Sequence, residues 1–149
     1  MRAVALDLDG AIGDTRPLWA AWLADAAQRS RLDVASLPAD RGEAAAELDE
    51  RLGNWRALLE RFASDNAAVH LRPNAETSAA LRRLASAGVR LGAFTDAPDE
   101  LARVAAAQLG AARRLEALEC GADALDRLLA QLGADALVVR TRAELAALG

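Results

Sequence analysis

The sequence contains no lysine, no tyrosine, one cysteine and one histidine among its 149 residues. All 18 basic residues are therefore arginine, and the net charge is −4. An acidic balance gives no electrostatic support for contacts with a phosphate backbone, so we expect no nucleic-acid partner. The single cysteine, Cys120, excludes a disulfide within the chain. That pattern is typical of a reducing compartment, and we expect a cytoplasmic protein.

Long apolar stretches are also missing. No segment reaches the roughly 18 consecutive apolar residues of a membrane-spanning helix, so we expect no membrane partner. The apolar segment near residue 1 is too short for the centre of a signal peptide. The chain is nevertheless 53% hydrophobic and 27% charged. This balance supports a hydrophobic core, and the length fits one domain or a domain with a small insert.

The most informative segment reads AVALDLDG, from Ala3 to Gly10. Four apolar residues in a row predict a short buried strand that leads into Asp7 and Asp9. Strand side chains alternate between two faces, so we expect both carboxylates on the same side. Two such acids repel each other unless a cation lies between them or one carries a proton. Gly10 then allows the backbone to turn sharply.

The next part of the chain predicts helices. We expect one helix from Asp14 or Thr15 to about Ser30, a loop over 32–41, and a helix over 43–63 that is kinked or broken near its middle, at a glycine. All three tryptophans lie in these two helical segments. We interpret their apolar stripe as the packing seam of a helical hairpin rather than a ligand-binding surface.

From residue 71 onward, predicted helices and strands alternate. The expected strands cover 89–94, 115–119 and 136–139, and the expected helices cover 75–87, 98–109, 122–132 and 141–148. Such alternation predicts a parallel sheet with helices on both faces, an α/β fold of about four strands. Sites in these sheets lie at the carboxyl ends of the strands.

Two motifs carry a resemblance to a known family. The segment Asp7-Leu8-Asp9-Gly10, followed by Asp14, resembles the first motif of the haloacid dehalogenase-like (HAD) phosphohydrolases. The segment Leu91 to Asp96, an apolar strand that ends in Thr95, resembles the second. The resemblance implies a Rossmann-like sheet with its first strand central, the second and third on one side, and the fourth on the other.

The resemblance also implies how the chain is divided. A small α-helical cap inserted after the first strand is similar to that of phosphoglycolate-phosphatase-like members. The resemblance assigns 1–14 and 71–149 to the α/β core and 15–70 to the helical cap.

The chemistry follows from the same resemblance. It implies that Asp7 is the nucleophile that becomes phosphorylated and that Asp9 is the general acid and base. A Mg²⁺ ion that bridges Asp7 and the phosphate would reduce the repulsion between the two anions. Asp9 favours phosphate chemistry over carbon–halogen cleavage, which has no need of an acid. The expected activity is hydrolysis of a small phosphorylated metabolite through an aspartyl-phosphate.

Thr95 has two interpretations. A hydroxyl at a strand end, followed by free backbone N–H groups, suits a phosphate oxygen, with Asp96 and Gly10 beside it. Alternatively, Thr95 caps the helix expected to begin near Pro98. The Asp7 and Asp9 pair on an adjacent strand favours phosphate binding.

The third family motif is missing. The family implies a lysine close to the position of Gly121, where its charge would offset those of the nucleophile and the phosphate. Arginines elsewhere in this half of the chain, at positions 113, 114 and 127, are in the wrong places for a strand-end site.

The fourth motif is altered, and it leaves two hypotheses open. Arg140 stands where a metal-binding Asp belongs, and Glu144 falls at the second acid, which leaves Asp7, Asp9 and Glu144 as candidate Mg²⁺ ligands. In the first hypothesis the chain is a phosphatase of reduced turnover. In the second, Arg140 pairs with Asp7 and Asp9 or binds phosphate directly. The chain is then an inactive HAD-like protein that binds an anionic ligand or a protein partner. The sequence is compatible with a monomer or a homodimer.

Overall fold

The protein is built on a four-stranded parallel sheet. The structure is a computed structural model, and it describes residues 2–148. The strand order across the sheet is β3-β2-β1-β4, all neighbours being parallel. This order confirms the expected central position of the first strand. The strands are β1 (Ala3–Asp7), β2 (Arg90–Thr95), β3 (Ala117–Cys120) and β4 (Leu137–Val139).

The central strand β1 has apolar side chains on both faces because both faces are covered. Val4 and Leu6 belong to the larger of two hydrophobic clusters, whereas Ala3 and Ala5 belong to the smaller one on the opposite face. All four residues are buried. An unbroken apolar run is the sequence signature of such a strand. Asp7, the next residue, is the first polar one and lies where the strand ends.

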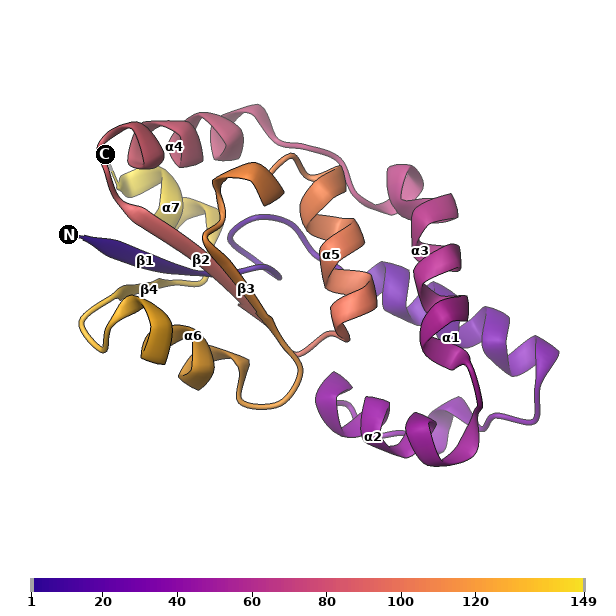
Figure 1. Cartoon of the computed structure of the whole chain (residues 1–149). Coiled ribbons are helices and arrows are strands. Elements are labelled where there is room, and N and C mark those ends of the chain that lie inside the picture. The colour runs from indigo at the N-terminus through magenta and orange to yellow at the C-terminus, as the bar shows by residue number, and fades with distance from the viewer. Residues whose placement is uncertain (1, 149) are drawn as a thin grey trace.

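Helices cover both faces of the sheet (Figure 1). On one face lie α4 (Ala75–Ser86), α5 (Asp99–Gln108) and α7 (Arg142–Ala147), and on the other lies α6 (Ala124–Leu132). A short 3₁₀ turn, η2, follows α5 (Ala112–Arg114). Leu128 and Leu132 of α6 fill the smaller cluster. The α/β architecture predicted from the alternation of elements is confirmed.

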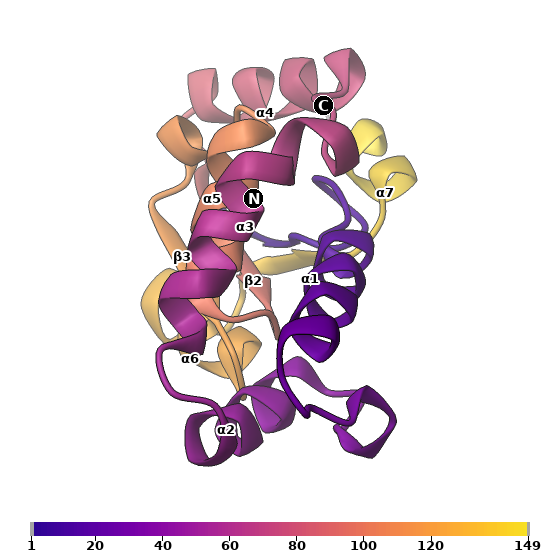
Figure 2. The same ribbon diagram turned by 90° about the vertical axis from the view of Figure 1, so that its right-hand side faces the viewer.

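Three helices are inserted between β1 and α4, and we call them the cap. They are α1 (Arg16–Arg29), α2 (Arg41–Arg51) and α3 (Trp55–His70), with a 3₁₀ turn, η1 (Val34–Ser36), between the first two. Figure 2 shows α1 and α3 next to each other, with α2 below them. The cap therefore lies beyond the carboxyl end of β1, where the sequence predicts the site.

The three tryptophans pack against one another inside the cap. Ring centroids lie 5.4 Å apart for Trp19 and Trp22, and 5.7 Å apart for Trp22 and Trp55. All three side chains are buried. Each such aromatic pair adds about 1 kcal/mol beyond its buried area. The tryptophans hold α1 and α3 together, as the packing interpretation predicts.

The helix expected over 43–63 differs from the structure at both ends, whereas the break expected near its middle is confirmed. The chain breaks at the Gly53-Asn54 pair, where Asn54 takes a left-handed conformation with φ of 59°. The first part, α2, begins earlier, because the Asp40 carboxylate accepts the Glu43 N–H and caps it. The second part, α3, continues seven residues further than expected. Buried Ala67 extends the inward face of α3 through this stretch, and alanine gives a weak apolar signal.

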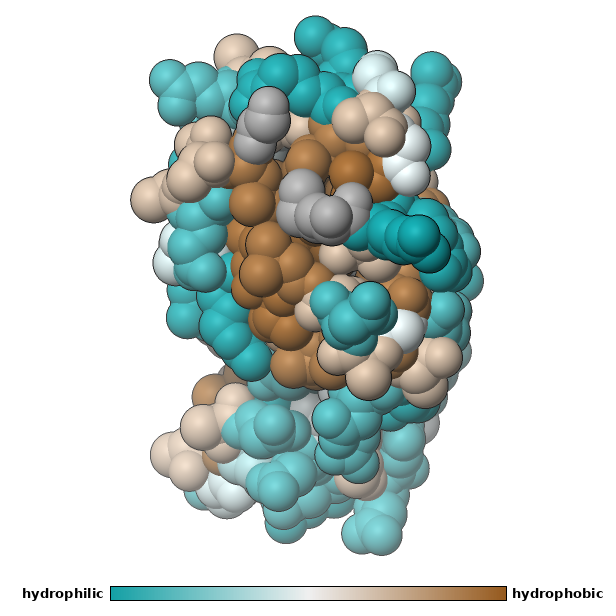
Figure 3. Space-filling view, turned by 90° about the vertical axis from the view of Figure 1, so that its left-hand side faces the viewer, coloured by the Kyte–Doolittle hydropathy of each residue, from teal (hydrophilic) through white to brown (hydrophobic). Residues whose placement is uncertain are grey.

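One side of the molecule carries an exposed apolar area. Figure 3 shows a broad apolar area, framed by polar residues, on the side where β1 begins and the chain ends. This side lies away from the carboxyl ends of the strands. Within residues 2–148, no helix is both long and apolar enough to cross a bilayer.

Candidate active site

The chain turns back on itself directly after β1. The Gly10 N–H donates to the Gly13 carbonyl, and the Gly13 N–H donates to the Leu8 carbonyl. Gly10 has φ of +134°, a conformation open to glycine but strained for other residues. A Cβ at this position would also overlap the carbonyl oxygen of Arg140. Gly10 thus shapes the turn and lets β4 approach it, and the structure gives it no other role at the site.

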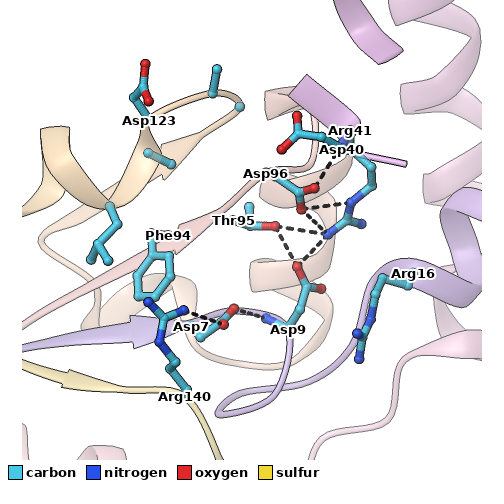
Figure 4. A pocket seen from close by; sticks show the side chains of 14 residues that line it. Asp7, Asp9, Arg16, Asp40, Arg41, Phe94, Thr95, Asp96, Asp123 and Arg140 are labelled. Carbon is cyan, nitrogen blue, oxygen red and sulfur yellow. Dashed lines mark hydrogen bonds and ion pairs between the residues drawn. The ribbon is translucent and has the colours of Figure 1, made fainter. Parts of the chain in front are cut away.

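Asp7 stands at the carboxyl edge of the sheet and faces a cleft (Figure 4). Its Oδ1 accepts the Asp9 N–H at 3.0 Å. Burial raises the pKa of Asp7, and the neighbouring Asp9 charge adds to this, while the Asp9 N–H and Arg140 lower it less. The Asp7 side chain remains 20% exposed, so a ligand in the cleft can reach its carboxylate.

Asp9 is fully engaged by hydrogen-bond donors. One carboxylate oxygen accepts the Thr15 N–H at 2.7 Å and the Thr15 hydroxyl at 2.6 Å. The other accepts the Thr95 hydroxyl at 2.6 Å and the Arg41 guanidinium at 2.5 Å. Burial alone would raise the pKa of Asp9, but Arg41 and the threonine hydrogen bonds more than offset it, so the pKa is lowered. Asp9 is therefore held as an ionised acceptor in this conformation.

Arg41 is the residue that the sequence analysis missed. Among residues 2–148, Arg41 is the only charged residue that is buried, although it belongs to the cap. Its Nη1 donates to the Thr15 hydroxyl at 2.7 Å, and its Nη2 donates to Asp9 and to Asp96. Its position offers one signal: a cation in the first turn of a helix faces the positive end of the helix dipole. Such a placement is unfavourable unless acidic groups surround it.

The end of β2 supplies two further polar residues. The Thr95 hydroxyl donates to Asp9 and accepts the Ala97 N–H at 3.2 Å, so it already has partners within the protein. The Asp96 carboxylate accepts both the N–H and the Nε–H of Arg41, each at 3.0 Å. Both Thr95 and Asp96 line the cleft, and both already bind protein groups, although the Asp96 side chain is 39% exposed.

Arg140 lies on the other side of Asp7. Its Nη1 is 3.6 Å from Asp7 Oδ2, and its guanidinium lies 5.4 Å from the centre of the Phe94 ring. The side chain is 56% exposed, so the pair is open to solvent and weak. Of the two expected partners of Arg140, the structure places only Asp7 beside it. Asp9 pairs with Arg41 instead.

The Mg²⁺ ligands implied by the family resemblance do not come together. Glu144 lies at the start of α7, where its N–H donates to the Thr141 hydroxyl, its carboxylate accepts from the same hydroxyl, and its side chain is exposed. It does not line the cleft. Among residues 2–148, no three acidic, histidine or cysteine side chains cluster so as to hold a metal ion. With Arg140 beside Asp7 and Arg41 on Asp9, the donor set does not fit Mg²⁺.

The position of the missing lysine is occupied by backbone. Gly121 has φ of +82° and lines the cleft at the end of β3. Arg127 points toward the backbone, where it donates to the carbonyls of Cys120 and Ala122 and pairs with Glu119 at 3.0 Å. Burial, followed by the nearby Asp99 carboxylate, raises the pKa of the Cys120 thiol to about 12. Cys120 is therefore a protonated, unreactive thiol, consistent with a packing role.

The cleft that these groups line has a volume of about 440 Å³, enough for a small metabolite. Five of the lining residues are aspartates and three are arginines, as Figure 4 shows for the labelled side chains. The aspartates are at positions 7, 9, 40, 96 and 123, and the arginines are at positions 16, 41 and 140. Arg41 and Arg140 each contact at least one of these carboxylates. An anionic ligand must therefore compete with carboxylates for the guanidinium groups.

Comparison by sequence matches the chain to no family model and to no curated protein. Comparison of structures gives clear matches. CbbY from Rhodobacter sphaeroides, solved in complex with phosphate, matches with a TM-score of 0.69 at 15% identity. The match covers 93% of this chain and 76% of CbbY. A Thermotoga maritima protein proposed to be a beta-phosphoglucomutase matches with a TM-score of 0.58 at 19% identity, over 98% of this chain and 80% of that one.

These matches and the strand order define the class of fold. The chain has a HAD-like fold, with a parallel Rossmann-like sheet and a small helical cap. At these levels of identity the likeness concerns the fold alone. What the chain does has to be argued from its own cleft.

Proposed function

We propose that the chain is a slow phosphomonoesterase that acts on small phosphorylated metabolites. The observation that carries this proposal is the position of Asp7. Its carboxylate lies at the carboxyl end of the central strand, faces a cleft of metabolite size, and has a guanidinium beside it. CbbY, which has the same fold, is described with phosphate bound. A phosphate ester in this cleft would meet a carboxylate nucleophile and a cation at one place.

The proposed reaction uses Asp7 directly. An Asp7 oxygen attacks phosphorus, an O–P bond forms, and the ester P–O bond breaks, so that the alcohol oxygen leaves with its electron pair. Water then attacks the aspartyl-phosphate, which releases phosphate and restores Asp7. Arg140 would offset part of the negative charge at the reacting phosphate. Arg140 is a single exposed cation, so its contribution is small.

Low turnover follows from the state of Asp9. An ionised carboxylate whose two oxygens accept four hydrogen bonds cannot donate a proton to the leaving alcohol. General acid catalysis commonly contributes about 10²–10⁴-fold to a rate. We therefore expect the chain to prefer aryl phosphates, whose leaving phenolate is stable without a proton, over alkyl phosphates.

Turnover of p-nitrophenyl phosphate tests this proposal. The wild type should release p-nitrophenolate faster than Asp7→Asn, and it should hydrolyse glycerol phosphate far more slowly. Asp123→Asn is the matched control, because Asp123 lines the same cleft and the substitution removes the same charge. Added EDTA should leave the rate unchanged. Equal rates for the wild type and Asp7→Asn would overturn the assignment of an esterase.

A second function is favoured by the same hydrogen bonds to Asp9. If Asp9 stays locked after a ligand enters, the cleft binds a phosphate ester without cleaving it. Calorimetry with inorganic phosphate and glycerol phosphate distinguishes this function. Binding that persists in a wild type with no turnover above Asp7→Asn supports it. Turnover that depends on Asp7 excludes it.

A further inference from the structure

One side chain, Arg41, joins the cap to the core at the site. It belongs to the first turn of α2, and its partners come from the turn after β1 and from the end of β2. The Asp96 carboxylate also accepts the Arg41 backbone N–H at 3.0 Å, so it caps α2 from the core. One carboxylate therefore holds both the backbone and the guanidinium of the same residue.

The neighbouring residue shows how closely α2 approaches the core at this end. A Cβ on Gly42 would lie 2.7 Å from the backbone nitrogen of Ala122, in the loop after β3. The cap also meets the core elsewhere, since α3 packs along α5 and Arg56 pairs with Glu100 at 3.1 Å. At the cleft itself, the first turn of α2 contacts the core through Arg41.

The Arg41 guanidinium uses its donors on carboxylates that line the same cleft as Asp7. It contacts Asp9 at 2.5 Å and Asp96 at 2.8 Å. Its side chain is only 4% exposed, so its charge is neutralised inside the protein and little of it reaches the cleft. A phosphate group that enters the cleft is a stronger acceptor than one carboxylate and has the geometry to accept two N–H groups of a guanidinium.

We propose that Arg41 is an internal latch, whose guanidinium binds Asp9 and Asp96 in the free protein and exchanges these partners for the phosphate of a ligand. This proposal rests on the proposed binding of phosphate esters and adds how that binding is controlled. While the latch is closed, α2 is held on the core and Asp9 has no free acceptor position. A ligand that takes Arg41 away from Asp9 frees a carboxylate oxygen next to the reacting group.

Hydrogen exchange of the backbone amides of α2 tests whether Arg41 holds this helix. Arg41→Gln and Asp96→Asn should each speed exchange over 44–51 by tenfold or more. The matched control is Arg51→Gln, on the same helix, because Arg51 is exposed and its contacts, a 3.7 Å pair with Glu47 and a 3.4 Å hydrogen bond to the Ser36 hydroxyl, stay within the cap segment. Asp96→Asn keeps the buried arginine paired with Asp9, so it serves if Arg41→Gln does not fold. Exchange in both site variants at the rate of Arg51→Gln overturns the latch.

Titration with inorganic phosphate tests the exchange of partners, because two variants should change affinity in opposite directions. Arg41→Gln removes the cation and should weaken phosphate binding at least tenfold. Asp96→Asn removes one of the two carboxylates that hold the cation and should tighten phosphate binding at least threefold more than Asp123→Asn, which removes one negative charge from the same cleft without touching Arg41.

Three further outcomes separate the proposals. Weaker phosphate binding in both Arg41→Gln and Asp96→Asn would mean that Arg41 is a structural cross-link only, and it would overturn the exchange of partners. A wild type that binds no phosphate and hydrolyses no aryl phosphate would overturn both the proposed function and the proposed exchange of Arg41's partners. If the wild type binds phosphate normally but the amide hydrogens of α2 exchange no faster in Arg41→Gln and Asp96→Asn, the latch alone is overturned.

Discussion

The Arg140 guanidinium lies 3.6 Å from the carboxylate of Asp7 and contacts it from the end of β4. The family resemblance places a metal-binding acid at this position. The Arg140 guanidinium thus stands where the resemblance implies a Mg²⁺ ion and one of its acidic ligands. An arginine offsets negative charge but brings no open coordination positions, so it cannot polarise a phosphate oxygen as a metal does.

Arg140→Asp should create Mg²⁺ affinity. The substitution removes the positive charge beside Asp7 and adds a carboxylate, which makes two acidic oxygen donors close together. Calorimetry should show millimolar or tighter Mg²⁺ binding for Arg140→Asp and none for the wild type. Arg142→Asp is the control, since it changes the charge equally two residues away on an exposed site. Binding of equal strength in both variants would contradict the prediction.

Asp9→Asn should cost about 3 kcal/mol of stability at pH 7, because it leaves the buried Arg41 with one carboxylate fewer. Denaturant unfolding measures the loss. Asp14→Asn is the control: its carboxylate pairs with exposed Arg16 at 2.7 Å, and we expect a change within about 0.5 kcal/mol.

The loss of stability in Asp9→Asn should depend on pH with a definite sign. The pKa of Asp9 is lower in the folded protein than its ordinary value of 3.8. Its contribution to stability is therefore complete above the unfolded pKa and is lost as the pH falls through the folded one. The difference in unfolding free energy between the wild type and Asp9→Asn should shrink below pH 3.8. A difference that grows on acidification would show that Asp9 is not held in its charged form.

Trp22→Ala should destabilise the protein by about 4 kcal/mol, because it empties the centre of the tryptophan cluster. Trp22 is 2% exposed and stacks within 5.7 Å of both other tryptophans. Leu58→Ala, at a residue of the same cap that is 44% exposed, should change stability by less than about 0.5 kcal/mol. Urea unfolding followed by circular dichroism compares the two. Similar losses would mean that the cluster contributes little to the cap.

Gly10→Ala should be more harmful than Gly88→Ala. Both glycines have positive φ, 134° and 81°, so both substitutions strain the backbone by about 1–2 kcal/mol. A Cβ at residue 88 meets open space, whereas one at residue 10 overlaps the carbonyl oxygen of Arg140. We expect Gly10→Ala to cost at least twice as much in thermal unfolding. Equal costs would show that β4 moves away from the turn freely.

Local patterns in the sequence predicted the sheet well because strand β1 needs apolar residues on both faces. The same pattern located Asp7 and Asp9 at the strand end, and both line the cleft. The packing of the tryptophans also followed from helical spacing. These features depend on neighbours in the chain, where periodicity reports burial directly.

The missed features depend on residues that are far apart in the chain. Arg41 and Asp9 are 32 residues apart, and Asp96 is 55 residues beyond Arg41. No spacing rule joins a helix in the cap to two strand ends, and the proline and polar residues of 32–41 predict a loop there. The position expected for Glu144 failed for a related reason. At the start of a helix an acid pairs with groups in its own turn, and here the Glu144 carboxylate accepts the Thr141 hydroxyl while the Glu144 N–H donates to the same hydroxyl.

Both cations that contact the acids of the cleft are arginines, and this fixes how the site responds to alkaline solutions. A lysine ammonium starts to lose its proton near pH 10, with an ordinary pKa of about 10.4. A guanidinium stays protonated at any pH that a folded protein tolerates. The positive side of this cleft is therefore constant, and reagents that modify amines cannot neutralise it. Any change in anion binding with pH must come from the carboxylates or from the ligand itself.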